Sequence, residues 1–143
     1  TINASDNDGN NAAEKSVTFK VDTIPPTLNI SAPVNELVTN TASLVLRGNT
    51  NDASTSPVTV KITLNGTDQG AITVGGDGTF TKTLTLKEGA NTIVVTATDA
   101  AGKASTVSRS VTLDTSKPVI KSAVISPNPV DAGASMVITV VVE

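Results

Sequence analysis

Residues 91–114 read NTIVVTATDAAGKASTVSRSVTLD, and this stretch carries the pattern that decides the fold. Apolar residues alternate with threonine, serine and other polar residues on both sides of the turn sequence DAAGK, as half-buried strands require. The inward positions are Ile93, Val95 and Ala97 before the turn, and Val111 and Leu113 after it. The stretch therefore predicts two strands joined by a tight turn, with one face of each strand in a common core.

A similar sequence stands at the start of the chain, where residues 1–23 read TINASDNDGNNAAEKSVTFKVDT. Asp22 in Val-Asp-Thr matches Asp114 in Leu-Asp-Thr, at an offset of 114 − 22 = 92 residues. A period of this length suits a whole small β-domain rather than a solenoid unit. We therefore expect three parts: the last two strands of a preceding domain in 1–22, a complete domain in 23–115, and the first strands of a following domain in 116–143.

The complete domain is expected to be an all-β antiparallel sandwich, because short alternating runs are separated by turn residues throughout. The predicted strands are 27–31, 41–48, 58–65, 70–75, 78–86, 91–99 and 105–114. Further inward positions are Leu28, Ile30, Leu44, Leu46, Val58, Val60, Ile62, Leu64, Phe80, Leu84 and Leu86. Lys82 and Arg109 interrupt the inward pattern, which we interpret as bulges or sheet-edge positions.

The composition argues against several classes of function. The chain has no histidine, cysteine, tryptophan or tyrosine, so it lacks the usual general base, a thiolate, and nitrogen or sulfur ligands for zinc. Two phenylalanines cannot form a stacking platform for bases or sugars, and a net charge of −3 repels a phosphate backbone. Apolar runs are too short to span a bilayer. We therefore expect that the protein is not an enzyme, that it has no nucleic-acid partner and that it does not insert into a membrane.

Several runs, taken in order, resemble a known family. They are DTIPPTLNISAP (22–33), VTVKITLNG (58–66), LKEGANTIVVTATDAAGK (86–103) and SVTLDT (110–115). They resemble a bacterial immunoglobulin-like domain array, most closely the glucodextranase B-like group. The resemblance implies a seven-stranded antiparallel immunoglobulin-like sandwich, here flanked by strands of two incomplete neighbouring domains. The buried tryptophan, disulfide and tyrosine corner of eukaryotic immunoglobulin domains are missing.

Four aspartates are candidate calcium ligands at the joint before the complete domain. Because strand direction alternates, the linker, the loop after the second strand, the turn before the fifth and the turn after the sixth all lie at one pole. These segments carry Asp22, Asp52, Asp77 and Asp99, respectively. Carboxylate oxygens are ligands that calcium prefers. The alternative for Asp22, and for Asp114 at the next linker, is that the carboxylate caps the chain beside prolines that stiffen the joint.

A second, weaker calcium candidate is the sequence SDNDGN, in which Asp6, Asp8 and Asn10 could supply alternating oxygen ligands. The sequence departs from the EF-hand loop, because Val17 occupies the twelfth position, where that loop has glutamate. The alternative is a hairpin turn favoured by aspartate and glycine.

The function we expect is that of a non-catalytic spacer or stalk module in a multidomain extracellular or cell-surface bacterial protein, with adjacent immunoglobulin-like domains as partners. The alternative is an adhesion or polysaccharide-associated module appended to a carbohydrate-active enzyme, binding a protein or polysaccharide through loops such as 49–56. The terminal segments present apolar faces: Val17, Phe19 and Val21 in one, and Met136, Ile138, Val140 and Val142 in the other. We therefore expect this chain to self-associate through its incomplete terminal domains.

Overall fold

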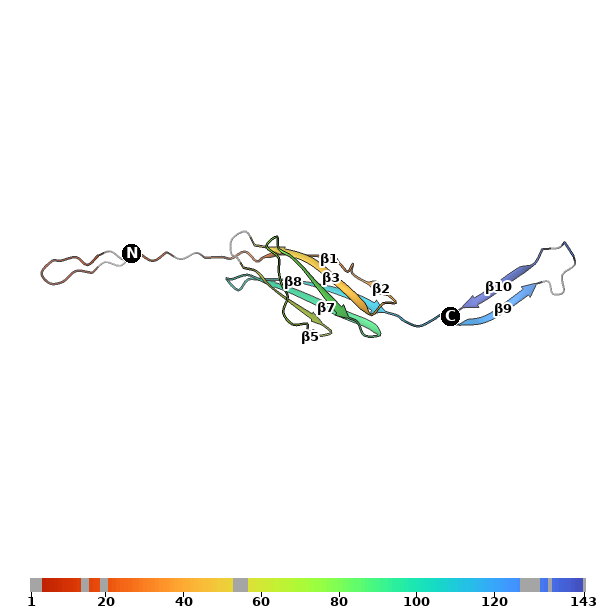
Figure 1. Ribbon diagram of the computed structural model, residues 1–143. Coiled ribbons are helices and arrows are strands. Elements are labelled where there is room, and N and C mark those ends of the chain that lie inside the picture. The colour runs from red at the N-terminus through yellow and green to blue at the C-terminus, as the bar shows by residue number, and fades with distance from the viewer. Residues whose placement is uncertain are drawn as a thin grey trace.

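The computed structural model describes residues 4–13, 16–18, 21–52, 57–126, 132–133 and 135–142. Two β-sheets form a sandwich over residues 27–113, and no described residue lies in an α-helix (Figure 1). In this part of the chain there is consequently no helix that could cross a membrane. The predicted all-β class is confirmed.

The first sheet has three antiparallel strands in the order β1-β3-β6. Their bounds are Thr27–Ala32 for β1, Ser43–Asn51 for β3 and Thr79–Thr85 for β6. These strands confirm the predictions for 27–31, 41–48 and 78–86, with differences of a few residues at the ends. In the β3–β6 ladder Gly48 lies opposite Phe80, which brings the only aromatic side chain of the sandwich over a glycine.

The second sheet has the order β2-β8-β7-β4-β5. Its strands are β2 (Leu37–Thr39), β8 (Ala104–Leu113), β7 (Gly89–Thr98), β4 (Thr59–Leu64) and β5 (Thr67–Asp68). The β7–β8 hairpin is the one that residues 91–114 predict, and its register runs unbroken from Thr98 opposite Ala104 to Gly89 opposite Leu113. A second hairpin turns at Asn65 and Gly66, both with positive φ (51° and 79°), as an Asn-Gly turn between paired strands requires.

The predicted strand at 70–75 is wrong, because these residues belong to no strand. The two-residue strand β5 pairs with β4, and the chain then turns at Gly70, whose N–H donates to Asp68 Oδ1 (2.9 Å) and whose φ is +76°. Ile72 and Val74 still pack against the core as half-buried side chains. The alternation of apolar and polar residues in 70–75 therefore reflects the packing of Ile72 and Val74 against the core, although the segment forms no ladder of backbone hydrogen bonds with another strand.

Strand β2 is absent from the prediction, and it runs parallel to β8 in an otherwise antiparallel sheet. The chain crosses from the first sheet to the second between β1 and β2. Glu36, with φ of 61°, donates its N–H to Ser110 O (2.8 Å), and Ser110 N donates to Asn35 Oδ1 (2.9 Å). Three residues are too few to show a period of two, so this strand is set by its contacts with β8.

Lys82 and Arg109 lie at sheet-edge positions, as one of the two sequence interpretations requires. Lys82 is on β6, an edge strand of its sheet. Arg109 is on the part of β8 that β2 does not cover, and its guanidinium donates to the carbonyls of Ile30 and Pro33 at 3.3 Å each. Neither ladder shifts register at these residues, so the bulge interpretation is wrong.

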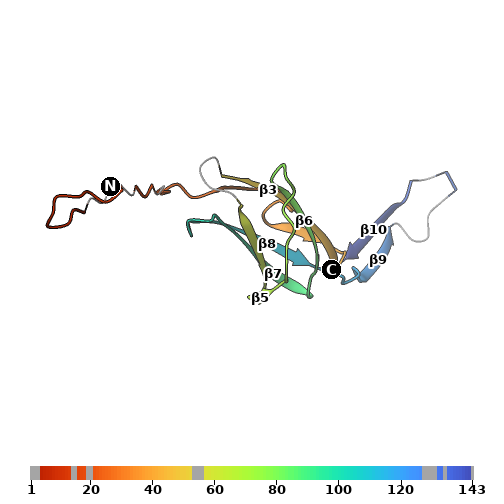
Figure 2. The ribbon, with the colours of Figure 1, turned by 60° about the vertical axis from the view of Figure 1, so that its left-hand side comes forward.

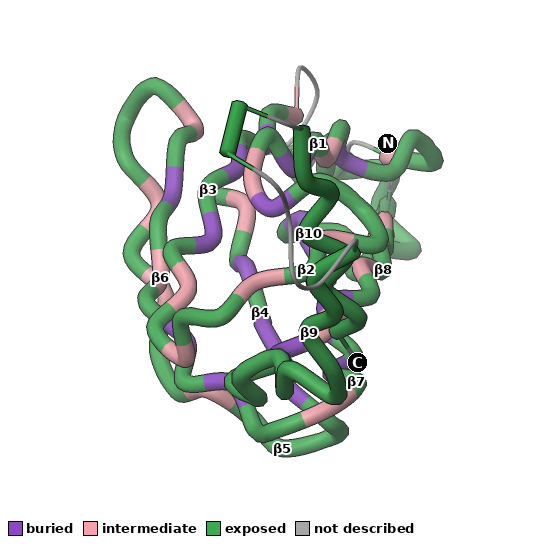
Figure 3. Tube along the Cα trace, turned by 90° about the vertical axis from the view of Figure 1, so that its right-hand side faces the viewer, coloured by how far each residue is buried: buried purple, intermediate pink, exposed green. Residues whose placement is uncertain are grey.

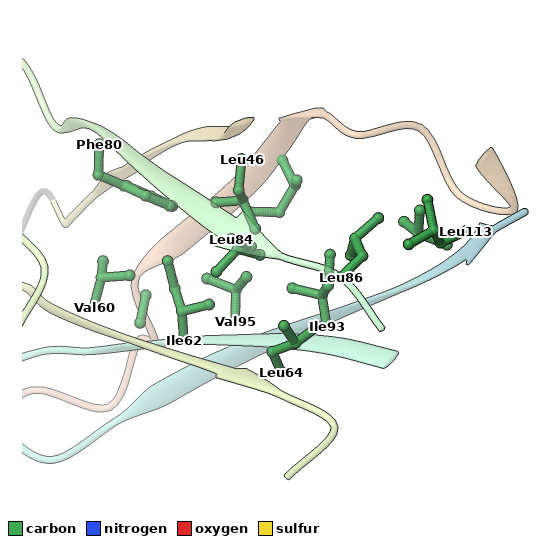
Figure 4. Close-up of a cluster of buried hydrophobic side chains, with 13 residues drawn as sticks. Leu46, Val60, Ile62, Leu64, Phe80, Leu84, Leu86, Ile93, Val95 and Leu113 are labelled. Atoms are coloured by element: carbon green, nitrogen blue, oxygen red, sulfur yellow. The ribbon is translucent and has the colours of Figure 1, made fainter. Parts of the chain in front are cut away.

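The core lies between the two sheets, where side chains from both inner faces meet (Figure 4). Buried and exposed residues alternate along strands such as β3 and β6 (Figure 3). Each inward position predicted from the sequence is buried or packs half-buried against this core. The buried apolar residues are Ile30, Leu46, Val60, Ile62, Leu64, Phe80, Leu84, Leu86, Ile93, Val95, Ala97, Val111 and Leu113.

Flanking segments extend from opposite ends of the sandwich (Figure 2). After it, β9 (Ile120–Ser126) and β10 (Val137–Val142) form an antiparallel hairpin within the range 116–143, where the first strands of a following domain are expected. Before it, the described residues contain an isolated bridge between Ser5 and Asn11 but no strand, although two strands are predicted there. Phe19 lies outside the described residues.

Candidate metal centre

Three carboxylates from three separate segments meet at the end of the sandwich where the chain enters it. One carboxylate oxygen each from Asp22, Asp52 and Asp99 lie within 4.8 Å of one another. Asp22 belongs to the linker before β1, Asp52 directly follows β3, and Asp99 begins the β7–β8 turn. We call this end of the domain the N-terminal pole; it is the end toward the N-terminal segment in Figure 1.

Asp99 is held by the tight turn that the sequence DAAGK predicts. Its backbone N–H donates to Lys103 O (3.0 Å), and its Oδ1 accepts the N–H of Lys103 (2.8 Å). Gly102 supplies the positive φ, +81°, and donates to Asp99 O at 3.2 Å. The side chain is 6% exposed, and its Oδ2 is buried with no hydrogen-bond partner among the described residues.

Asp52 is positioned by the end of β3, which backbone and hydroxyl hydrogen bonds anchor on two sides. Thr50, 2% exposed, donates its hydroxyl to Thr27 O (2.6 Å) and its N–H to Gly78 O (2.9 Å). A side chain at Gly78 would stand 1.9 Å from Thr50 O, so only glycine permits this approach. Asp52 therefore directly follows a strand end that hydrogen bonds anchor to β1 and to the turn before β6.

Asp22 is positioned by the proline linker. Its Oδ1 accepts the N–H of Ile24 (3.0 Å), which forms the local cap that the sequence suggests as an alternative role. Four residues later Pro26 is buried, and its carbonyl accepts the Ser105 hydroxyl (2.6 Å) at the start of β8. The linker is therefore anchored to the same hairpin that carries Asp99. The local cap at Asp22 is therefore present, as that alternative requires.

Asp77, the fourth aspartate predicted for this site, is not part of the cluster. Its Oδ1 accepts the Thr79 hydroxyl (2.7 Å) and the Thr79 N–H (3.0 Å). The Thr79 hydroxyl, followed by the Thr79 N–H, holds the pKa of this carboxyl below its usual range. The carboxylate thus closes its own turn instead of facing the other three.

The second candidate site, at Asp6, Asp8 and Asn10, forms a hydrogen-bonded turn. Asp6 Oδ1 accepts the N–H groups of Asp8 (3.1 Å) and Asn10 (2.9 Å), and Asp6 Oδ2 accepts the Asn10 side-chain amide (2.9 Å). The Asn10 side chain is the main cause that lowers the pKa of the Asp6 carboxyl. Both oxygens of Asp6 serve the turn, in agreement with the structural alternative for this sequence.

Two contacts that fix the site are absent from the sequence analysis. The Ser105–Pro26 hydrogen bond joins residues 79 positions apart, and the Thr50–Thr27 bond joins residues 23 positions apart. Serine and threonine are common throughout this chain, so no local pattern distinguishes these two from the others. Gly78 could have been recognised as a turn residue, although only weakly, because it ends the glycine-rich sequence GGDG.

Comparison with known proteins agrees with the geometry of the sandwich. The structural neighbours include the fibronectin(III)-like modules of CbhA from Clostridium thermocellum, with a TM-score of 0.54 and 22% identity, over 76% of this chain and 57% of that one. An engineered protein matches with a TM-score of 0.46 and 23% identity, over 62% of this chain and 20% of that one. The first likeness places the fold among immunoglobulin-like and fibronectin III-like sandwiches. The chain spans little more than half of that neighbour's length.

Residues 26–115 match the sequence profile of the family described as glucodextranase, domain B. The chain therefore belongs to the glucodextranase domain B family, and the resemblance to this group drawn from its turn and strand sequences is confirmed. The comparison with curated protein sequences gave no significant match. The matched range begins three residues after the predicted start of the complete domain and ends at its predicted end.

Proposed function

We propose that the chain is a non-catalytic spacer module of a multidomain, extracellular or cell-surface bacterial protein. The observation that carries the proposal is that the chain enters the sandwich at one pole and leaves it at the opposite pole (Figure 1). A domain with this path adds length when it is linked to neighbours. A module built to present a loop or pocket needs no such path.

The last strand of the sandwich determines this separation. Strand β8 starts beside the linker, where Ser105 binds Pro26, and runs for 10 residues to Leu113. At about 3.3 Å per residue, β8 alone carries the chain about 30 Å from the N-terminal pole. At the far end Asp114 N donates to Thr39 O (2.9 Å), and Thr115 binds Glu88 through its N–H (3.1 Å) and its hydroxyl (2.9 Å). Both ends of the domain are thus anchored before the linkers begin.

The described surface gives less support to the alternative of a polysaccharide or protein ligand. A hollow beside Asp52 has no aromatic residue in its lining, which consists of Thr50, Asn51, Asp52, Pro57, Val58, Val74, Gly75, Gly76 and Gly78. A second hollow, beside Arg47, includes Phe80, but that ring is only 4% exposed. Sugar recognition commonly uses exposed aromatic faces, and neither hollow provides one. Residues 53–56 of the loop proposed as a binding element lie outside the described residues.

Small-angle X-ray scattering on a chain in which the 92-residue unit is duplicated tests the spacer role. We expect the maximum dimension to increase by about 40 Å per added unit, from the length of β8 and an extended linker. An increase of less than half that value would mean that domains fold back beside each other, and the spacer role would be rejected. Affinity electrophoresis in gels containing dextran tests the alternative, and a retarded band would favour it.

A further inference from the structure

We propose that Asp22, Asp52 and Asp99 bind one calcium ion, which fixes the linker against the N-terminal pole of the domain. The proposal concerns a metal site and does not depend on the spacer role, because binding is measurable on this chain by itself. It rests on two separate observations: the convergence of three carboxylates and the buried, unpartnered oxygen of Asp99.

The buried oxygen is the stronger of the two observations. A buried polar atom in a native protein is nearly always hydrogen-bonded, because leaving it without a partner is unfavourable. Asp99 Oδ1 has its partner in the Lys103 N–H, but Oδ2 has none among the described residues. A cation between the three carboxylates would supply the missing partner. It would also relieve the repulsion between like charges that the fold brings together.

The spacing of the oxygens suits calcium. Two ligands on opposite sides of a calcium ion are at most about 4.6 to 5.2 Å apart, because each lies 2.3 to 2.6 Å from the ion. Magnesium demands near-ideal octahedral geometry and gives up its bound water reluctantly, so a cluster of three carboxylates suits it less well than calcium. The three oxygens lie within 4.8 Å of one another, so one calcium ion could contact all three with little movement. Carboxylates are hard ligands, and water or backbone carbonyls would complete the six to eight positions that calcium takes.

The ligands come from both sides of the joint. Asp52 and Asp99 belong to the sandwich, whereas Asp22 belongs to the linker that precedes Pro26. An ion shared among them would therefore restrict the angle between the sandwich and the segment before it. Hydrogen bonds from Pro26 onward already hold the later part of the linker, so calcium would extend this anchoring by four residues toward the N-terminus.

The aspartate cap in the linker, one of the two parts of the site, occurs again at the next joint. Asp114 accepts the N–H of Ser116 at 3.0 Å, just as Asp22 accepts the N–H of Ile24. The turn that carries Asp99 also has a counterpart in the leading segment. There Asp6 makes the same hydrogen bonds with Asn10 that Asp99 makes with Lys103. The proposal therefore extends to the following joint, with Asp114 as its linker ligand.

Calcium binding to the purified 143-residue chain tests the proposal. We expect isothermal titration calorimetry to show one site and 10 mM calcium to raise the melting temperature by about 5 to 10 °C over the value in EDTA. Asp99→Asn, Asp52→Asn and Asp22→Asn should each weaken binding at least about tenfold. Asparagine at position 99 keeps an oxygen that can accept the Lys103 N–H, so the turn should be retained.

Asp77→Asn is the matched control, since it removes the same charge from a nearby turn outside the cluster. It should leave calcium binding unchanged. Equal melting temperatures with calcium and EDTA would overturn the proposal. So would an equal effect of magnesium, or an Asp77→Asn variant as impaired as Asp99→Asn, because either would indicate general charge screening.

A second measurement needs no change to the carboxylates. Because the chain has no cysteine, spin labels at Thr18→Cys and Thr83→Cys would report only the distance between the leading segment and the sandwich. Double electron–electron resonance should give a narrower distribution of label-to-label distances in calcium than in EDTA. Identical distributions, in a chain that binds calcium, would overturn the role of the ion at the joint and leave the binding site itself supported.

Discussion

Asn65 and Asn91 interlock across the second sheet: the Asn65 side-chain amide donates to Asn91 Oδ1 at 3.0 Å, and Asn65 Oδ1 accepts the Thr92 N–H at 2.8 Å. Asn91 is 1% exposed, and its side chain also binds the backbone of the β6–β7 turn. It accepts the Lys87 N–H (3.0 Å) and donates to the carbonyls of Lys87 (2.7 Å) and Gly89 (2.9 Å). One buried side chain thus joins two turns at the C-terminal end of the domain.

Asn91→Ala should lower the free energy of unfolding by about 2 to 4 kcal/mol, because it leaves several backbone groups of the turn without partners. Urea unfolding followed by circular dichroism measures the change. Asn29→Ala is the control, since Asn29 is exposed and makes one 3.3 Å bond to Asn49. A loss below about 1 kcal/mol at Asn91 would show that water satisfies the turn equally well.

Phe80→Ala should lower the free energy of unfolding by about 3 to 5 kcal/mol. The ring is 4% exposed and is the only aromatic group in the core, so its removal leaves a large cavity. The same urea titration tests it. A loss below about 1 kcal/mol would mean that the neighbouring side chains close the cavity.

Gly48→Ala should also destabilise the domain, because a Cβ at this position would lie 2.6 Å from Phe80 Cζ and 2.7 Å from Asn29 O. The backbone oxygen cannot move away without disturbing the β1–β3 ladder. We expect a loss of about 1 to 3 kcal/mol, the usual range for overpacking. Gly76→Ala is a suitable control, since a Cβ there meets nothing within 4 Å. Equal stability of the two variants would contradict the close approach of β3 to Phe80.

The domain should become less stable as the pH falls below about 4. Thr79 lowers the pKa of Asp77, and the Gly70 N–H, followed by Lys61, lowers the pKa of Asp68. Since the folded pKa values are depressed, this stabilisation is present above the pKa of the unfolded chain and is lost as the pH falls through the folded pKa. Urea midpoints at pH 7 and pH 3, measured in EDTA, should differ less in Asp77→Asn and Asp68→Asn than in the parent chain. An unchanged difference would assign the acid sensitivity to other groups.

The 143-residue chain should self-associate, whereas residues 23–115 alone should remain monomeric. On one face of the β9–β10 hairpin Ile138 pairs with Ile125, and Val140 pairs with Ala123. Ile138 is 61% exposed and Val140 is 50% exposed, so burying this apolar face against a second copy of the chain would be favourable. Light scattering at high concentration measures the state of both chains. Ile138→Lys should reduce association of the longer chain, and a monomeric longer chain would show that the hairpin stays exposed.

The sequence by itself determined which face of each long strand is buried. In β7 the inward residues Ile93, Val95 and Ala97 are 0% exposed, as their spacing predicts. This information is local, because alternate side chains of a strand point to opposite faces. The Asn65-Gly66 turn and the β7–β8 turn are equally local, since they depend on the φ values that their own residues can adopt.

Only the tertiary structure decided which segments become neighbours. Strand β2 exists because β8 supplies its partner, and residues 70–75 pack against the core without forming a strand. The sequence placed four aspartates at one pole, but the structure brings three together and leaves Asp77 bound to Thr79. The physical reason is the separation in sequence of the residues that determine each feature. Strand direction fixes the end at which a loop lies, whereas the direction of a carboxylate within a few ångströms depends on hydrogen bonds such as Ser105 to Pro26, which join residues distant in the sequence.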